Sequence, residues 1–327
     1  MLEWLADSIL LSIFTGSIYV IVSLGLTLTL AVVKLPNFAH AEFLTIGAYV
    51  GVVVSSVYPN NLIVIGTAAF LFCSGLALVI HHVAFKPLMD KKVSIYILVL
   101  ASFAVAQFVR YSVFSWASYA GLLSATQHIS IYPLVTLSNT ELTNVYALAI
   151  ILAIAISAAL QLFLSLTSVG KSMRAIASNI DLAKLSGINV GRMVDLMWIL
   201  AGGLGGLGGM IFGIYTTVTP ALGFNTLLNI FAVVIIAGLT SFTGTIIGGF
   251  VVGFAQNTLM DFLYYYFGVS FGFQPLLPFA LIIIVLLVKP TGLAPTSQTG
   301  FGRLRRLIRR EDGNTGKEQG PKGVSGV

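Results

Sequence analysis

The sequence predicts an all-α polytopic membrane protein with eight or nine transmembrane helices. Two observations support this fold class. The 327 residues are 57% hydrophobic and only 9% charged, with a mean hydropathy of +0.98, whereas soluble domains are about 45–50% apolar and about a quarter charged. The apolar residues also fall in long runs, and a run of about 20 apolar residues crosses a bilayer as a helix. We therefore expect a multi-pass protein of the plasma (inner) membrane.

Six spans are expected before residue 220, and two or three more in residues 226–288. The uncertain member of the later group is 226–240, because it is short and is followed by the glycine-rich sequence SFTGTIIGG. It is either a full crossing or a broken, re-entrant helix. The first six spans are expected at residues 8–33, 42–58, 62–84, 93–115, 144–167 and 193–218.

Lysine and arginine residues give the expected orientation, since cytoplasmic loops are enriched in them. Loop 168–192 is basic, and so is the loop that holds Lys86, Lys91 and Lys92. The loop 116–143 has no lysine or arginine, so it is expected outside. Counting back along the spans places the N-terminus outside and the C-terminus in the cytoplasm, an arrangement that requires an odd number of crossings.

The chain divides into a transmembrane domain, residues 1–299, and a basic cytoplasmic tail, residues 300–327. Five arginines between Arg303 and Arg310 supply much of the net charge of +6, so the charge describes one tail and does not indicate a nucleic-acid partner. The end of the tail is rich in glycine and polar residues and is expected to be partly disordered.

No catalytic motif is present in the sequence. The GKS sequence at Gly170–Ser172 lacks the glycine that a P-loop needs five residues earlier, where Ser165 stands. The single cysteine, Cys73, forms no intrachain disulfide. The adjacent His81 and His82 point about 100° apart on an α-helix, so we expect them to be poor metal ligands. We therefore expect a protein that is not an enzyme, with no cofactor and no metal site.

The segment Ser168–Arg192 is a polar, basic island between two long apolar runs. Met173, Ile176, Ala177 and Ile180 recur at helical spacing, and Gly187 follows as a helix-terminating glycine would. The pattern predicts a helix that either lies on the membrane surface or serves as a rigid handle for a cytosolic partner. Both interpretations fit the pattern equally.

Polar residues interrupt the apolar runs in two regions. In KLPNFAHAE, Lys34–Glu42, the proline breaks a helix and the asparagine can cap the next one. This segment is either a capped turn near the cytoplasmic face or a break that lines a polar pathway. Later in the chain, polar residues recur four apart on one helical face. The candidates for a substrate pathway are Asn37, His40, Glu42, Asn225, Asn229, Gln256 and Asn257.

Glycines recur four apart in the late apolar segments. Such small-xxx-small pairs let helix backbones approach closely in lipid, so we expect them at helix contacts; the alternative is a pore lined by backbone. The expected helix-packing residues are Gly202, Gly206, Gly209, Gly213, Gly244, Gly248 and Gly253.

Four stretches together resemble one family, the LivH-type permease subunits of ABC importers for branched-chain amino acids. They are GSIYVIVSLGLTLTLAVVKLPNFAHAEFLTIGAYV, VGKSMRAIASNIDLAKLSGINVGR, AVVIIAGLTSFTGTIIGGFVVGFAQN and LLVKPTGL. The resemblance covers most of residues 15–293. The sequence departs from the family pattern at two places. Ala41 occupies a position where the family usually has glycine. His81 and His82 occupy positions where the family commonly has an acidic–basic pair.

The resemblance implies a permease subunit that forms the membrane pathway of an ATP-driven importer. Its expected partners are cytosolic ABC ATPase subunits, an extracytoplasmic solute-binding protein and a second homologous permease, expected as a heterodimer in the lipid bilayer. Loop 170–187 would be the coupling helix that docks on the ATPase. The coupling residues implied are Lys171, Arg174, Ala175, Ala177, Asp181, Leu185 and Gly187.

Other functions are compatible with the sequence. A urea or short-amide importer would have the same architecture. A stand-alone secondary transporter or channel would need ionisable residues at membrane depth for ion coupling, and Asp261, Arg110, Glu42 and Asp195 are sparse candidates. A membrane assembly factor would explain the glycine pairs but not the basic loop.

Overall fold

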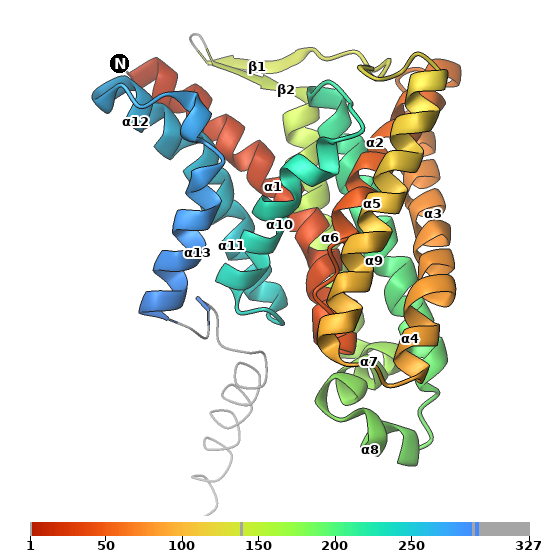
Figure 1. Cartoon of the computed structure of the whole chain (residues 1–327). Helices are drawn as coiled ribbons and strands as arrows, with labels where there is room; N and C mark the ends of the chain where they lie inside the picture. Colours follow the sequence, from red (N-terminus) through yellow and green to blue (C-terminus); the bar gives the residue numbers. More distant parts are fainter. Residues whose placement is uncertain (1, 138–139, 290–291, 294–327) are drawn as a thin grey trace, which may run out of the picture.

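The computed structural model describes residues 2–137, 140–289 and 292–293 (Figure 1). Within them, seven helices are long and apolar enough to cross a membrane, and two shorter apolar helices accompany them. The all-α polytopic fold class is therefore confirmed, while the count of eight or nine crossings stays a prediction. The basic tail predicted at 300–327 lies outside the described residues.

The helices follow the apolar runs of the sequence. In chain order they are α1 (Leu2–Val33), α2 (His40–Val57), α3 (Leu62–Ile80), α4 (Lys86–Asp90), α5 (Ile95–Tyr119), α6 (Asn144–Leu166), α7 (Ser168–Ser178), α8 (Ile180–Leu185), α9 (Val190–Tyr215), α10 (Leu222–Ala237), α11 (Phe242–Phe254), α12 (Met260–Phe267) and α13 (Leu276–Val288). Two π-helical turns, η1 (His81–Phe85) and η2 (Ala255–Leu259), and a 3₁₀ turn, η3 (Phe271–Phe273), complete the helical elements.

Three features differ from the sequence-based expectation. The third span continues past residue 84, because η1 and α4 extend α3 to Asp90. The loop that was expected outside starts after Tyr119 and carries an antiparallel hairpin, β1 (Pro133–Leu137) and β2 (Thr140–Thr143), a small addition to the all-α class. The uncertain segment 226–240 is α10, a 16-residue helix, which at 1.5 Å per residue is about 24 Å long and shorter than a bilayer core of about 30 Å.

Helix α1 is the central element of the bundle. Its residues from Phe14 to Leu30 are buried all round, as expected of a helix that is apolar on every face. It packs against α9, α11 and α6, while α9 also packs against α2 and α3. Figure 1 shows α11, α12 and α13 on one side of the bundle and α2, α3 and α5 on the other, with α1 and α10 between them.

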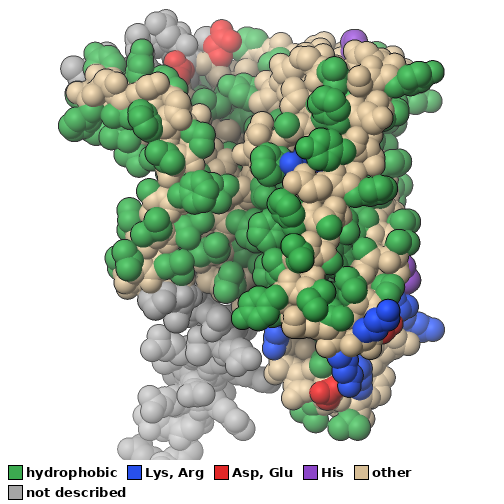
Figure 2. Space-filling model, in the orientation of Figure 1, with side chains coloured by type: hydrophobic (Ala, Val, Ile, Leu, Met, Phe, Trp, Pro, Cys, Tyr) green, Lys and Arg blue, Asp and Glu red, His purple; other side chains and the backbone are tan. Residues whose placement is uncertain are grey.

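The two ends of the bundle differ in charge. Lys and Arg side chains gather at the end that carries α4, α7 and α8 (Figure 2), whereas the N-terminus and the β1–β2 hairpin lie at the opposite end (Figure 1). The two basic loops of the sequence, around Lys91 and around Lys171, therefore share one end of the molecule.

Glycines bring α9 very close to α2 and α3. A Cβ added at Gly206 would lie 2.6 Å from Ala69 O and 2.7 Å from Cys73 Sγ, both on α3. A Cβ at Gly202 would lie 2.6 Å from Cys73 O, and one at Gly209 would collide with Leu44 O on α2. Real Cβ atoms do not approach neighbouring atoms so closely, so the backbones can only pack this way with glycine at these positions.

The later glycines allow equally close contacts between helix backbones in the second half of the bundle. A Cβ at Gly248 would lie 2.6 Å from Val233 O on α10, and one at Gly253 would lie 2.6 Å from Ser12 O on α1. Gly244 faces Ala237 O at the end of α10, and Gly213 lies against the Gln127 side chain. Helix α11 is thereby held between α1 and α10.

We expect Gly206→Ala to destabilise the protein and Gly75→Ala to leave it intact. The new methyl group at Gly206 would meet backbone and a buried thiol, so the free energy of unfolding should fall by about 1–3 kcal/mol. Gly75 is also helical, on the exposed face of α3, and a Cβ there meets nothing within 4 Å; alanine should be neutral or stabilise by up to about 1 kcal/mol. Thermal unfolding in detergent measures both, and equal midpoints for the two variants would contradict the close-packing interpretation.

Candidate functional site

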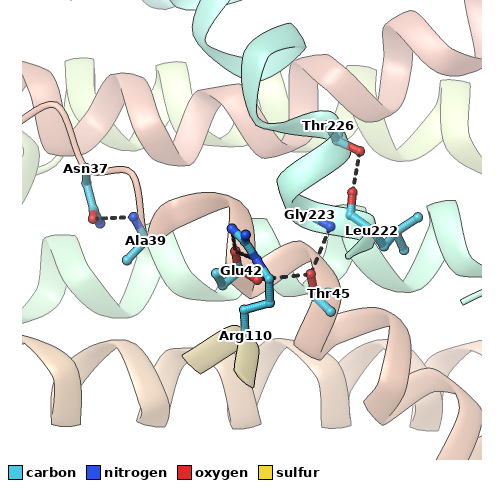
Figure 3. Close-up of polar contacts among 8 residues, drawn as sticks. All are labelled: Asn37, Ala39, Glu42, Thr45, Arg110, Leu222, Gly223 and Thr226. Atoms are coloured by element: carbon cyan, nitrogen blue, oxygen red, sulfur yellow. Dashed lines mark hydrogen bonds and ion pairs between the residues drawn. The ribbon is translucent and has the colours of Figure 1, made fainter. Parts of the chain in front are cut away.

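A buried ion pair joins α2 to α5. Arg110 donates from Nη2 and Nε to Glu42 Oε1, at 2.7 Å and 3.1 Å (Figure 3). The side chains of Glu42 and Arg110 are only 2% and 13% exposed, so water screens the attraction little. The Arg110 guanidinium also lies 3.9 Å from the ring centroid of Phe224, a favourable position for a cation against an aromatic face.

The first turn of α10 completes this cluster. Thr45 Oγ1 donates to Glu42 Oε2 at 3.4 Å and accepts from the backbone N–H of Gly223 at 2.9 Å (Figure 3). A Cβ at Gly223 would collide with Ala41 O, so glycine is needed for this approach. The first turn of α10 thus reaches the Glu42 carboxylate through the Thr45 hydroxyl. One polar cluster therefore fixes α2, α5 and α10 to each other.

The segment between α1 and α2 lies inside the bundle. Phe38 N donates to Ser102 Oγ at 3.1 Å, and Ser102 lies seven residues beyond the start of α5, about 10 Å along that helix. Asn37 Oδ1 accepts from Ala39 N at 3.1 Å and closes the turn before α2 (Figure 3). His40 Nε2 lies 2.8 Å from Val22 O on α1. Asn37 and His40 therefore hold the break in place.

A second polar cluster links α1, α10 and η2. Asn229 and Gln256 exchange two amide hydrogen bonds, of 3.1 Å and 2.8 Å. Tyr19 donates its hydroxyl to Gln256 Oε1 at 2.8 Å and accepts from Asn229 Nδ2 at 2.9 Å. All three side chains are buried. Buried amides need such partners, because an unpaired one costs about 1–3 kcal/mol.

This second cluster borders a polar cavity of about 160 Å³. Gln274 Nε2 donates to Gln256 O at 3.0 Å and helps to close it. Asn257 does not join the cavity, because its side chain donates to Thr15 Oγ1 on α1 at 2.7 Å. The residues that line the cavity are Asn225, Leu228, Asn229, Gln256, Gln274 and Pro275.

The predicted pathway residues therefore fall into three groups. Asn225, Asn229 and Gln256 meet at the cavity, Glu42 belongs to the ion pair, and Asn37, His40 and Asn257 make local or interhelical hydrogen bonds. Three residues of these clusters, Tyr19, Thr45 and Gln274, were not predicted from the sequence. Tyr19 and Thr45 lie in apolar runs, and no local sequence pattern indicates their hydrogen-bond partners. Gln274 could have been selected as a candidate, because it is an amide next to Pro275 at the start of a late apolar span.

The basic loop contains two helices, where the apolar stripe predicted one. Asn179 has an extended backbone and its Oδ1 accepts from Asp181 N and Leu182 N, so it ends α7 and caps α8. As a result Met173 and Ile176 are buried, but Ile180 is 41% exposed. The prediction of one continuous helix is wrong, because the Asn179 side chain competes with the helix for backbone N–H groups.

Helix α7 is anchored to the bundle. Thr167 Oγ1 accepts from Gly170 N at 3.0 Å and caps the helix. A Cβ at Gly170 would lie 2.5 Å from Leu164 Cα, so α7 turns back directly onto the end of α6. Arg174 is exposed and donates to Ser165 O at 3.4 Å. The buried face of α7 packs against α1, α6 and α9.

Helix α8, in contrast, presents apolar side chains to the outside. Leu182 is 62% exposed and Leu185 is 86% exposed, although both are large hydrophobic residues at the basic end. Gly187 has a left-handed backbone (φ +78°), and the N–H groups of Gly187 and Ile188 bond to Lys184 O and Ala183 O. This is the hydrogen-bond pattern of a Schellman cap, which confirms that Gly187 terminates the helix. Of the predicted coupling residues, Lys171, Arg174, Asp181, Leu185 and Gly187 are exposed, and Ala175 and Ala177 are half-buried.

The two adjacent histidines do not diverge as the sequence analysis expected. His81 and His82 lie in the π-helical turn η1, where the i→i+5 hydrogen bond from Lys86 N to His81 O widens the helix. The 100° step of an α-helix therefore does not apply to them. Both rings turn toward Asp195 in the first turns of α9, with Nε2–Oδ1 distances of 3.7 Å for His81 and 3.6 Å for His82.

Comparison with known proteins gives a family match over most of the chain. Residues 8–286 match the family described as "Branched-chain amino acid transport system / permease component". The matched range includes both polar clusters, the cavity, and helices α7 and α8.

Individual relatives agree with this match. A protein of Methanocaldococcus jannaschii named "Probable branched-chain amino acid transport permease protein LivH" is 26% identical, over 91% of this chain and 94% of that protein. The LivH permease protein of a high-affinity branched-chain amino acid transport system in Escherichia coli K12 is 26% identical, over 85% of this chain and 91% of that protein. Among solved structures, a chain of PsaBC from Streptococcus pneumoniae in complex with Fab is 16% identical with a TM-score of 0.47, covering 88% of this chain and 93% of that chain.

We expect Arg110→Met to destabilise the protein by about 3–5 kcal/mol, because it leaves the buried Glu42 carboxylate without its partner. The double variant Glu42→Met, Arg110→Met removes both charges and should recover most of that loss. A double-mutant cycle on thermal or denaturant unfolding in detergent measures the coupling. Strictly additive effects of the two substitutions would contradict a direct energetic link between α2 and α5 at this pair.

Proposed function

The chain belongs to the family of permease components of branched-chain amino acid transport systems, and we propose that it forms half of the membrane pathway of an ATP-driven ABC importer. In this proposal the α7–α8 unit docks on a cytosolic ATPase, and the solute moves along the polar clusters of α2, α10 and η2. The transported solute is a branched-chain amino acid or a similar small polar solute.

The exposed apolar face of α8 is the observation on which this proposal chiefly rests. Leu182 and Leu185 are large hydrophobic side chains that face outward next to Asp181 and Lys184. An apolar patch with a charged rim is typical of protein interaction sites. The sequence contains no Walker motif of its own, so an ATP-driven mechanism requires that a second protein supply nucleotide binding.

The connections of α7 and α8 suit the transmission of force. Gly170 holds α7 tightly against the end of α6, and Met173 and Ile176 bury its inner face. Asn189 caps α9 through its Oδ1, which accepts from Arg192 N at 3.1 Å. A displacement of α8 by a partner would therefore reach both α6 and α9. Such rigid-body motion of packed helices is a known way to alternate access to a central site.

The cavity of about 160 Å³ has a chemistry suited to a zwitterion. The exposed amide of Asn225 can donate to a carboxylate and accept from an ammonium group without carrying net charge, whereas the amides of Asn229 and Gln256 are largely engaged with each other and with Tyr19. A solute that is neutral overall would meet no unpaired charge there. The cavity is smaller than the 300–1,000 Å³ of typical ligand pockets, which favours a small solute or one part of a larger pathway.

The remaining features of the proposal come from the family. A second homologous permease completes the pathway as a heterodimer, and an extracytoplasmic solute-binding protein delivers the solute. The basic end of the bundle, with α4, α7 and α8, faces the cytoplasm according to the positive-inside rule. In this proposal the N-terminus lies outside and the C-terminus inside.

We expect the double substitution Leu182→Ser, Leu185→Ser to abolish co-purification with the ATPase and to lower ATP-dependent leucine uptake by at least tenfold. Both side chains are exposed, so the amount of folded chain in the membrane should not change. Affinity purification from native membranes, followed by identification of bound proteins, provides the first measurement.

Leu123→Ser provides the matched control, because Leu123 is a 42% exposed leucine in the loop that follows α5, away from α7 and α8. This variant should keep the ATPase and the uptake. Retention of the ATPase by the double variant would refute docking through α8. Wild-type uptake that persists after ATP depletion would indicate a stand-alone transporter, and uptake of urea in place of leucine would indicate an amide importer.

We expect Asn225→Leu to weaken solute transport without loss of the ATPase. The side chain lines the cavity but is exposed on α10, so its replacement should preserve the fold while it removes an amide from the pathway. The apparent KM for leucine should rise by about tenfold or more, since a lost hydrogen bond to a charged group is worth about 1.5–3 kcal/mol. Unchanged KM and kcat would exclude this cavity from the solute route.

A further inference from the structure

A cluster of metal-ligating side chains lies at the basic end, outside the proposed pathway and the α7–α8 unit. It comprises His81 and His82 in η1 and Asp195 in α9. One ligand atom from each of the three residues lies within 4.8 Å of the others. The histidines and the aspartate are more than 100 residues apart in sequence, and the packing of α3 against α9 brings them together.

The distances in the cluster fit an ion between the side chains better than direct hydrogen bonds. The Nε2 atoms of His81 and His82 are 3.7 Å and 3.6 Å from Asp195 Oδ1, beyond the 2.7–3.2 Å of a hydrogen bond. A tetrahedral metal with bonds of about 2.1 Å separates its ligand atoms by roughly 3.4 Å. Both nitrogen–oxygen separations are thus close to the spacing that a metal ion would impose.

The hydrogen bond of His82 orients its ring for metal binding. His82 Nδ1 lies 3.1 Å from Leu78 O. A carbonyl oxygen can only accept, so Nδ1 carries a proton, and Nε2 is the ring nitrogen that faces Asp195 and is left to bind a metal ion. Metal-bound histidines commonly donate the other ring N–H to a backbone carbonyl in this way.

The ring of His81 is held in place by stacking. Its side chain is only 5% exposed, and its Nδ1 is buried without a hydrogen-bond partner. The ring stacks on Trp198, with centroids 5.3 Å apart and an angle of 23° between the planes. Trp198 also stacks on Phe85. The Nε2 atom of His81 faces the Asp195 carboxylate from beyond hydrogen-bond distance, which leaves room for a cation between the two groups.

We propose that His81, His82 and Asp195 bind one divalent transition-metal ion, of the zinc or nickel class. Two imidazoles and one carboxylate are the donor set that these ions prefer, whereas Mg²⁺ and Ca²⁺ prefer oxygen ligands. The side chains of His82 and Asp195 are 45% and 35% exposed, so the site is open to the surrounding water, which supplies the remaining ligand. The bound ion joins the end of α3 to the start of α9, next to Asn189 and the α7–α8 unit.

This assignment is independent of the transported solute and is tested by metal binding alone. The full chain, purified in detergent without a polyhistidine tag, is titrated with Zn²⁺ by calorimetry. The wild type should bind one ion per chain. His82→Ala and Asp195→Asn should each weaken binding at least tenfold. His81 is left unchanged, because its burial would confuse loss of a ligand with loss of folding.

His128→Ala is the matched control, because His128 is an exposed histidine in the loop that follows α5, and it should bind Zn²⁺ as the wild type does. As a second measurement, Ni²⁺ should quench tryptophan emission in the wild type, since Trp198 stacks on His81, and should quench it much less in His82→Ala. Absence of stoichiometric binding by the wild type would overturn the proposal and leave the cluster as a histidine–aspartate ion pair. Equal affinity in the wild type and both ligand variants would also overturn it.

Discussion

The close approach of α9 to α2 and α3 is the constraint on which the rest of the structure depends. Gly202, Gly206 and Gly209 place the backbone of α9 directly against Cys73, Ala69 and Leu44. Apolar side chains gain nothing by leaving lipid for one another, so the association must come from this dense packing. Because α9 is fixed in this way, the residues at its start, which adjoin α8 and the histidine cluster, have a defined position relative to α3.

Polar contacts then determine where α10 can lie. The helix is too short to be placed by its length, but Gly223 reaches Thr45 at one end and Asn229 reaches Gln256 further along. Each contact involves buried groups that would be left unsatisfied if α10 moved. The ion pair of Glu42 and Arg110 adds α5 to the same cluster. Helix α10 therefore couples the two sides of the bundle through hydrogen bonds, whereas α9 is held against its neighbours by close packing at its glycines.

Hydrophobic runs predicted the fold class and the bounds of the first six spans to within six residues, because helices in lipid are dictated by length and apolarity. The candidate site was predicted in part. Asn229 and Gln256 were recognised as polar, but their partner Tyr19 is more than 200 residues from either in sequence, and no local pattern records such a contact. The break at Asn179 had a signal that was overlooked, since asparagine is a preferred N-cap residue. The π-helical turn at His81, in contrast, has no recognisable signal in the sequence.

The single cysteine of the chain has a practical consequence. Cys73 is buried, and its thiol faces Phe43 O and the surface of Gly206, where the helices leave no space for another atom. Reagents that label thiols from water therefore have no route to it while the bundle is folded. The natural chain therefore has no cysteine that reacts with such reagents while it is folded. A cysteine introduced at an exposed position would be the only one to carry a fluorophore or spin label. Labels placed in this way on α8 and α9 would report the motion of one helix relative to the other without altering the core.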